Sequence, residues 1–352
     1  MGYNTVEENV MEKMFKSYTF NILLILVFTV SALYLTIRDF VDEILLALQS
    51  IDEGWLIVVI LMALLYHVLI GIILTQLTRM SNPKYKYRQG IVNALIAAFF
   101  HGITPSASGG QFAQVYVFNK QKIPLSDAAS VLWLDFIIYQ STMVVTVFIL
   151  MLFRFQYFFN SHSPLFIFVF FGFLINASII FGLWLLARLP RFHNWVSTRG
   201  IEFGIKMRLI KDKEKSIAFM EEQIDRFQIE KAKIPSHKPL ITKVVCLNII
   251  RLMFYYFLPF VAMKSLGISL IEGYTFIDVM ALSAFVAMIN AFIPIPGASG
   301  GTEATFILMF TTIMGYINAS ATMIIWRLSN FYLIMIIGGI TFVLYKFINR
   351  NK

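Results

Sequence analysis

Six runs of apolar residues, each long enough to cross a bilayer, constrain this sequence more than any other feature. They cover about residues 18–37, 55–77, 126–153, 164–187, 244–262 and 319–346. A spanning helix needs about 20 mainly apolar residues, because the hydrocarbon core holds no water to satisfy an open backbone. The chain is also 58% hydrophobic and only 14% charged, unlike soluble domains. The sequence therefore predicts an all-α polytopic membrane protein.

Lysines and arginines beside these runs predict the orientation, since short loops rich in them face the cytoplasm. Basic residues precede the first run and follow the last, so both termini are expected in the cytoplasm of a cytoplasmic-membrane protein. The stretch 188–243 holds 13 Lys or Arg against 7 Asp or Glu, which predicts a basic cytoplasmic linker. Residues 38–54 place apolar residues at helical spacing between acids, which is typical of an external amphipathic helix.

Two further apolar segments are interrupted by the same motif, P-x-A-S-G-G-x-x-A, at an offset of 191 residues. The matched pairs are Pro105 and Pro296, Ala107 and Ala298, Ser108 and Ser299, Gly109 and Gly300, Gly110 and Gly301, and Ala113 and Ala304. The apolar arms beside each motif are too short to span, at about 10 to 14 residues. This pattern predicts re-entrant hairpins, one over 89–120 from the cytoplasm and one over 277–315 from the exterior.

The same offset places the flanking runs over one another, so the repeated unit is helix, hairpin, helix. Its two copies enter from opposite sides, which predicts an inverted-topology repeat of the kind that secondary transporters use. The expected organisation is about six full spans plus two hairpins. Its parts are an N-terminal span and external helix (1–54), repeat one (55–153), a connecting span and linker (154–243) and repeat two (244–352). Chance similarity, or a role of the small residues in packing alone, is the alternative.

The two motifs predict a polar site, because an unwound backbone in a bilayer must be buried in protein or line a wet cavity. Each proline ends a helix, and each glycine pair starts the next one, with serine hydroxyls and free N–H groups at its positive end. An anion such as phosphate suits that position. The candidate residues are Pro105, Ser108, Gly109, Gly110, Ser299, Gly300 and Gly301. Neither motif has the Gly-Lys-Ser/Thr ending of a nucleotide-binding loop.

Four ionisable residues inside apolar segments extend this site: Asp135, Arg251, Glu303 and Arg327. Such groups are expensive in a membrane unless they are paired or hydrated. We expect Glu303 and Arg327 to line one cavity with the motifs, and Arg251 to bind phosphate. Structural ion pairs, Asp135 with Arg251 and Glu303 with Arg327, are the alternative.

No motif for a metal or an organic cofactor occurs, and the single cysteine, Cys246, excludes a cysteine metal cluster. His67 and His101 lie within apolar segments, where they suit a proton relay or helix packing.

The segments "HGITPSASGGQFAQVYVF" and "IPIPGASGGTEATF", with the arginine of "WRLSNFYL", resemble the flippase-like transmembrane domain of the lysylphosphatidylglycerol synthase, or multiple peptide resistance factor, family. The resemblance covers nearly the whole chain. It implies a lipid translocase, since two-domain members flip aminoacylated phosphatidylglycerol. It also identifies Pro105, Ser108, Gly109, Gly110, Pro296, Gly300, Gly301, Glu303 and Arg327 as motif positions. Phe112 stands where the second motif has Glu303, so the halves differ. We expect no synthase activity, because neither 188–243 nor the C-terminus resembles the soluble transferase domain.

The leading hypothesis is a flippase or scramblase that moves a phospholipid-type, glycolipid or polyprenyl-linked headgroup through a cavity between the hairpins. An ion-coupled transporter of a small anion and a membrane scaffold for a lipid-modifying enzyme are the alternatives. Catalysis and nucleic-acid binding are not expected. A homo-oligomer and a separate lipid-modifying enzyme stay open as partners.

Overall fold

The computed structural model describes residues 41–104, 109–153, 164–188, 238–290, 293 and 295–348. Every regular element in this part of the chain is a helix, which confirms the predicted class. The expected span at 18–37, most of the linker 188–243 and the motif residues Pro105 and Ser108 lie outside the described residues.

Four helices within the described residues are long and apolar enough to cross a membrane. They are α3 (Glu53–Thr78), α6 (Leu125–Phe153), α12 (Lys238–Ser265) and a rod over Tyr316–Ile348, which joins α15 (Tyr316–Arg327), the π-helical turn η6 (Leu328–Tyr332) and α16 (Leu333–Ile348). They coincide with four of the apolar runs, and α8 (Pro164–Arg188) coincides with a fifth. The chain is therefore a multi-pass membrane protein.

The start of α12 differs from the sequence-based boundary at residue 244. The helix begins at Lys238 and includes residues 238–243, a segment of mixed polarity that precedes the apolar run. Pro239 does not prevent this, since a proline in the first turn removes no intrahelical hydrogen bond. Apolar length alone therefore underestimates this helix.

Four shorter helices form two pairs between the spans. In the first pair, α4 (Tyr87–Ile103) and α5 (Gly109–Lys120) have 17 and 12 residues. In the second, α13 (Phe276–Asn290) and α14 (Gly301–Met314) have 15 and 14 residues, and the short η5 (Pro296–Ala298) lies between them. At 1.5 Å per residue these helices are about 18 to 26 Å long, less than the roughly 30 Å of a hydrocarbon core.

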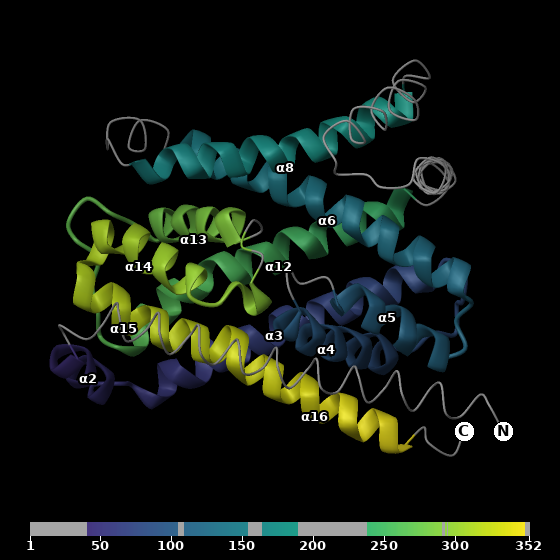
Figure 1. Ribbon diagram of the computed structural model, residues 1–352, viewed down its shortest axis with the longest axis horizontal. Helices are drawn as coiled ribbons and strands as arrows, with labels where there is room; N and C mark the ends of the chain where they lie inside the picture. Colours follow the sequence, from purple (N-terminus) through teal and green to yellow (C-terminus); the bar gives the residue numbers. More distant parts are fainter. Residues whose placement is uncertain are drawn as a thin grey trace.

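The two pairs lie on opposite sides of the molecule in Figure 1, with α13 and α14 on the left and α4 and α5 on the right. The rod connects them, since α15 packs on α14 and α16 packs on α4. The α8 helix packs on α6 and α13. There Asn176 Nδ2 donates to Met288 Sδ at 3.3 Å, and Asn176 Oδ1 accepts a hydrogen bond from Gln140 Nε2. The short α2 (Val41–Gln49) packs on α15.

Glycines permit the closest contacts between these helices. A Cβ atom on Gly71 would lie 2.5 Å from Ile91 Cα, where α3 meets α4. A Cβ atom on Gly338 would lie 2.3 Å from the Leu95 carbonyl oxygen, where α16 meets α4. Small residues serve this purpose in membranes, where helix association depends on close packing instead of on water exclusion. These contacts fix α4 against two spans.

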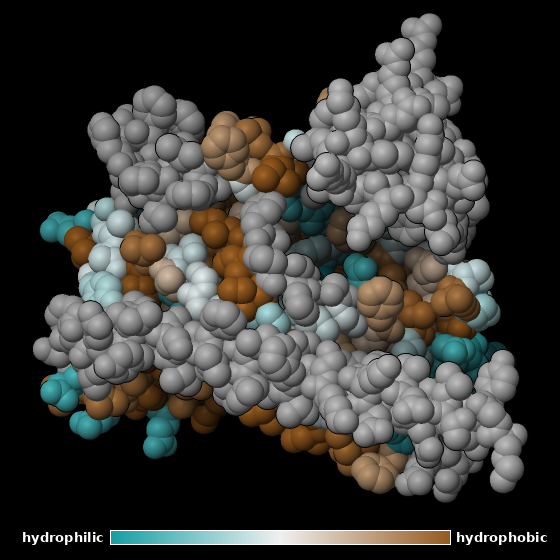
Figure 2. Space-filling model, in the orientation of Figure 1, coloured by the Kyte–Doolittle hydropathy of each residue, from teal (hydrophilic) through white to brown (hydrophobic). Residues whose placement is uncertain are grey.

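The outward faces of the spans carry large apolar side chains. Leu61 on α3 and Leu344 on α16 are 58% and 56% exposed, values that suit contact with lipid and not with water. Figure 2 shows such apolar residues along the lower edge of the molecule. Several polar side chains are instead buried inside the helical assembly, among them Asn93, Gln140 and Asn248.

Candidate functional site

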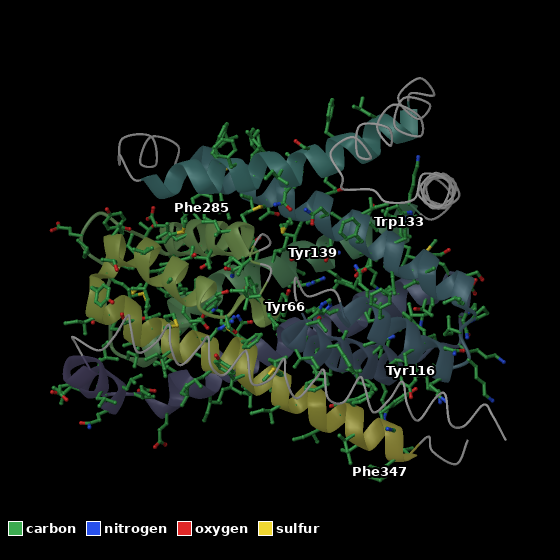
Figure 3. All side chains as sticks on the ribbon, in the orientation of Figure 1. Tyr66, Tyr116, Trp133, Tyr139, Phe285 and Phe347 are labelled. Atoms are coloured by element: carbon green, nitrogen blue, oxygen red, sulfur yellow. The ribbon has the colours of Figure 1, made fainter. Side chains whose placement is uncertain are left out.

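A cavity of about 500 Å³ lies among the helices and is lined by both short-helix pairs. The first pair contributes His101, Gln111 and Gln114, and the second contributes Asn290, Gly297 and Thr302. The spans contribute Asp135 from α6, Arg251 from α12 and Arg327 from the end of α15. Tyr66 and Tyr139, which also line it, lie near the centre of the molecule in Figure 3. We refer to this space as the central cavity.

The break between α13 and α14 has a left-handed backbone at three positions. The φ angles are 62° at Gly297, 50° at Ala298 and 84° at Gly300. Glycine adopts such angles freely, whereas a residue with a Cβ atom pays about 1 kcal/mol or more. Gly297 is required for space as well, since a Cβ atom there would lie 2.3 Å from Phe331 Cζ. The second motif therefore specifies the backbone path of this break, which we call the second tip.

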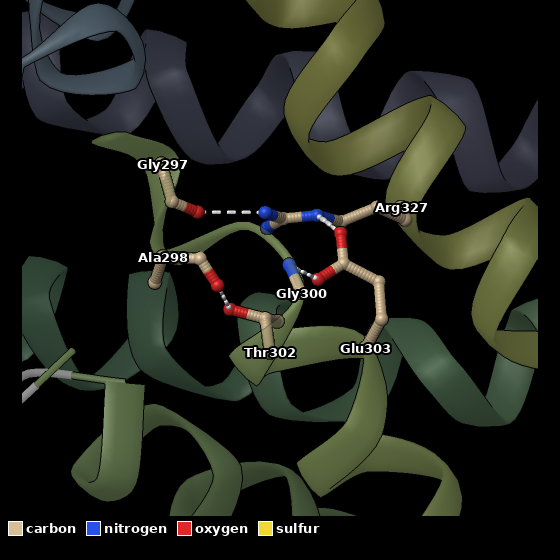
Figure 4. Close-up of polar contacts among 6 residues, drawn as sticks. All are labelled: Gly297, Ala298, Gly300, Thr302, Glu303 and Arg327. Atoms are coloured by element: carbon tan, nitrogen blue, oxygen red, sulfur yellow. Dashed lines mark hydrogen bonds and ion pairs between the residues drawn. The ribbon is translucent and has the colours of Figure 1, made fainter. Parts of the chain in front are cut away.

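A buried ion pair holds the same tip (Figure 4). Arg327 Nε donates to Glu303 Oε1 at 2.9 Å, and Arg327 Nη2 donates to the Gly297 carbonyl oxygen at 2.6 Å. The other oxygen of Glu303 accepts the Gly300 amide at 2.7 Å. The Arg327 guanidinium also stacks over Phe331, 3.9 Å from the ring centroid. These contacts connect α15 to both ends of the tip.

This network differs from the predicted anion site at the second tip. The Gly300 amide, which the sequence predicted to be free for a ligand, donates its hydrogen bond to the Glu303 carboxylate of the helix that follows. Glu303 is 1% exposed and does not reach the central cavity, whereas Arg327 does. The negative charge of Glu303 thus occupies the positive end of α14, where a carboxylate is stabilised by the helix dipole.

The break between α4 and α5, which we call the first tip, is bridged at its two ends by a different residue, Thr104. Thr104 Oγ1 donates to the Phe100 carbonyl oxygen at 2.6 Å and accepts the Gly109 amide at 2.8 Å. A Cβ atom on Gly110 would lie 2.3 Å from the His101 ring, so this glycine is needed where α5 meets α4. Phe112, at the position that matches Glu303, is 77% exposed and is not among the residues that line the cavity. The two tips are chemically unequal, as the sequence predicts.

Arg251 is buried in the central cavity without a carboxylate partner among the described residues. Its guanidinium stacks over Tyr139 at 4.2 Å from the ring centroid. Nη1 lies 3.3 Å from Asn248 Oδ1 and Nη2 lies 3.4 Å from the Tyr66 hydroxyl, both long hydrogen bonds. Nε has no hydrogen-bond partner within the described part of the chain. Arg251 therefore retains donors for a ligand, unlike Arg327.

Asp135 lines the central cavity from α6. Its Oδ1 atom is buried and has no hydrogen-bond partner among the residues that the structure describes. No salt bridge joins it to Arg251 in that part of the chain, so the predicted alternative of a directly paired Asp135 and Arg251 is not formed, although the two charges interact electrostatically. A buried polar atom without a partner costs about 1 to 3 kcal/mol, and more when charged. The cavity thus holds one carboxylate oxygen and one guanidinium nitrogen that lack hydrogen-bond partners among the described residues.

The predicted site residues fall into three groups. Asp135, Arg251 and Arg327 line the central cavity. A second group lies at the helix ends beside the two breaks and is not among the lining residues: Gly109, Gly110, Ser299, Gly300, Gly301 and Glu303. Pro105 and Ser108 lie outside the described residues. Ser299 is fully buried, and its hydroxyl has no partner in the described part of the chain.

Sequence reasoning missed several residues of the cavity. Tyr66, Tyr139 and Tyr255 are absent from the predicted site residues, although all three line the cavity. The available signal was a tyrosine in mid-span, but that pattern equally fits an ordinary packed helix. His67 and His101 also line the cavity, and His67 Nδ1 lies 3.0 Å from the Ala63 carbonyl oxygen. No group of three potential metal ligands occurs within the described ranges.

Comparison with known proteins places these observations in a family. Residues 21–338 match the family described as the lysylphosphatidylglycerol synthase TM region. The matched range includes both short-helix pairs and every charged residue of the central cavity. A search of curated proteins found no match.

Proposed function

The chain belongs to the lysylphosphatidylglycerol synthase TM region family, and we propose on that premise that it is a lipid translocase, a flippase or scramblase. The proposed substrate is a membrane lipid with a phospholipid-type headgroup, glycolipids and polyprenyl-linked lipids included. The headgroup crosses the cytoplasmic membrane through the central cavity while its hydrocarbon tails stay outside this polar space. Family membership supports a lipid-related membrane function, and the chemistry of the cavity supports the rest.

The observation that carries the proposal is that two charged side chains of the cavity, Arg251 and Asp135, each have a buried polar atom with no hydrogen-bond partner among the described residues. A guanidinium with free donors is the preferred protein partner of a phosphate, which it binds through two parallel hydrogen bonds. A carboxylate oxygen accepts a hydrogen bond from an ammonium or a hydroxyl group of the same headgroup. Burying both groups without a ligand is unfavourable inside membrane spans, so a polar ligand that satisfies both is stabilised there.

The proposed path for the headgroup requires that the short-helix pairs be re-entrant hairpins of an inverted repeat. Their lengths support this, since none of the four helices reaches across a hydrocarbon core. The helix bounds support the repeat: an offset of 191 places Leu125, the first residue of α6, on Tyr316, the first residue of α15. It also places α3 on α12 to within a turn or two at each end. Two opposed breaks can present one site alternately to each side.

Within this scheme the charged residues of the cavity bind the headgroup, and the residues of the two tips shape the site. Arg251 binds the phosphate, and Asp135 binds the polar remainder of the headgroup. Glu303 and Arg327 hold the second tip in place, so that Arg327 reaches the cavity with its charge already balanced. The motif residues Pro105, Ser108, Gly109 and Gly110 shape the first tip, and Ser299, Gly300 and Gly301 shape the second. Repeat one extends over 55–153 and repeat two over 244–352, with both termini in the cytoplasm.

Transport by the purified protein in liposomes tests the proposal. Phospholipids with a reducible fluorescent label report on headgroup exposure when a membrane-impermeant reductant is added outside. We expect loss of the inner-leaflet signal to be faster than in protein-free vesicles, and to slow in Arg251→Gln and Asp135→Asn variants. Cys246→Ser is the matched control, because Cys246 lies on α12 with Arg251 but is exposed.

Two outcomes would contradict the proposal. The first is lipid movement no faster than in empty vesicles for several phospholipids and polyprenyl phosphates. The second is uptake of free inorganic phosphate that depends on Arg251 while lipid movement does not, which would favour a small-anion transporter. If both assays fail and replacement of residues 188–243 by a neutral helix abolishes function in cells, a scaffold role is favoured instead.

A further inference from the structure

A second cavity, of about 550 Å³, lies between α6, α12 and α13, and its walls are almost entirely apolar. None of the described residues that line it is charged, and only Ser141, Thr142 and Thr146 carry a polar group. The Thr142 hydroxyl donates to the Ile138 carbonyl oxygen of its own helix at 2.7 Å, so it is already satisfied. We refer to this space as the apolar groove. It offers a polar ligand almost nothing to bind.

The apolar groove shares two walls with the central cavity. On α6, Tyr139 and Gln140 face the central cavity, whereas the neighbouring Ile138 and Ser141 face the groove. On α12 the same alternation occurs, with Arg251 on one side and Ile249 and Met253 on the other. The groove therefore begins beside the proposed headgroup site and extends along α6 as far as Phe153.

The surroundings of the groove determine what can fill it. Both α6 and α12 are candidate spans, so their outer faces contact the hydrocarbon region of the membrane. Apolar side chains at its margin are open to that region, with Val145 57% and Ile149 46% exposed. In lipid no hydrophobic driving force distinguishes one apolar partner from another, so retention depends on the number of van der Waals contacts. A chain in a concave groove between three helices makes more contacts per methylene than one against a single helix.

We propose that the apolar groove is a binding site for one acyl chain of a membrane phospholipid. The chain lies lengthwise between α6, α12 and α13 and packs against the rear of the helices that carry Arg251 and Asp135. The site needs only the membrane location of these spans, so it stands or falls separately from translocase activity.

Photocrosslinking identifies the occupant directly. The full-length protein in phospholipid nanodiscs would carry a photoreactive amino acid at Val145 or Ile149, and at Leu61 on the lipid-facing side of α3 as the control. After irradiation following detergent extraction, we expect phospholipid adducts at the two groove positions and few at Leu61. Equal adducts at all three positions would overturn the proposal, as would adducts with a segment of this chain or with a second copy.

A second measurement guards against a disturbed fold. Val145→Trp and Ile249→Trp fill the groove, and Leu61→Trp is the matched control. Each groove variant should retain about tenfold less phospholipid after extraction, since the chain loses on the order of ten carbon–carbon contacts. The midpoint of thermal unfolding in detergent should equal that of Leu61→Trp for both groove variants, which shows that the fold is intact. Unchanged phospholipid retention in both groove variants would overturn the proposal.

Discussion

Glu303 and Arg327 form an ion pair at 2.9 Å in which both side chains are more than nine-tenths buried. The pair joins the first turn of α14 to the last residue of α15, 24 positions apart in the sequence. Because Glu303 also accepts the Gly300 amide and Arg327 also donates to the Gly297 carbonyl, the two side chains fix the second tip from both ends. The first tip is held differently, by the hydroxyl of Thr104.

Breaking this pair should destabilise the protein. Glu303→Gln leaves the Arg327 guanidinium buried without its counter-charge, which typically costs about 3 to 5 kcal/mol. We expect a clearly lower midpoint of thermal unfolding in detergent than for Glu53→Gln, a change of the same type at an exposed position. The double variant Glu303→Gln/Arg327→Met should lose less stability than the two single changes together, since neither charge is then stranded. Additive losses would show that the two side chains do not interact.

Gly297 should be more sensitive to substitution than another glycine with a positive φ angle. Gly297→Ala meets both a backbone penalty and a clash, because its Cβ atom would lie 2.3 Å from Phe331. Gly267 has a φ angle of 65°, close to the 62° of Gly297, but nothing lies within 4 Å of a Cβ atom there, so Gly267→Ala isolates the backbone penalty of about 1 kcal/mol. We expect the first variant to lose the greater unfolding free energy. Equal losses would mean that the Phe331 contact is not required.

Lysine should not replace Arg251 in the central cavity. Arg251→Lys keeps the charge but removes the planar fork and its stacking on Tyr139, which lies 4.2 Å away. The loss of one charged hydrogen bond, about 1.5 to 3 kcal/mol, predicts lipid translocation slowed by about tenfold or more in liposomes.

Asp135→Asn should reduce transport of an ethanolamine phospholipid more than that of phosphatidylglycerol, since only the former presents an ammonium group. Equal effects on both lipids would remove Asp135 from headgroup recognition.

Tyr85, in the loop between α3 and α4, predicts a change of stability at high pH. Burial raises the pKa of its hydroxyl above the usual value of about 10. A folded-state pKa above the unfolded one leaves stability unaffected below pH 10 and lowers it as the pH rises further, because the unfolded chain then loses its proton first. Denaturant unfolding should show a smaller decline above pH 10 for Tyr85→Phe. An unchanged slope would show that Tyr85 titrates normally in the folded protein.

Much of this architecture was predictable because it depends on local composition. A stretch such as 55–77 must be helical in a bilayer, since no other backbone conformation satisfies its own hydrogen bonds there, and α3 begins and ends within two residues of it. The interruption at Pro296 and Gly297 was predictable for a similar reason, because proline ends a helix and glycine permits a positive φ angle. The family followed from the same motifs.

What the sequence determined by itself was therefore the helices, their breaks and the family to which the chain belongs. Only the tertiary structure decided which charges meet. Glu303 pairs with Arg327 and does not line the central cavity, whereas Arg251 lines it and has no salt bridge to a carboxylate among the described residues. In the sequence these charged residues look alike, since each stands within an apolar segment. The reason is physical: hydropathy and helix breaking act within a few residues, but pairing depends on how helices distant in the sequence are packed and rotated against each other.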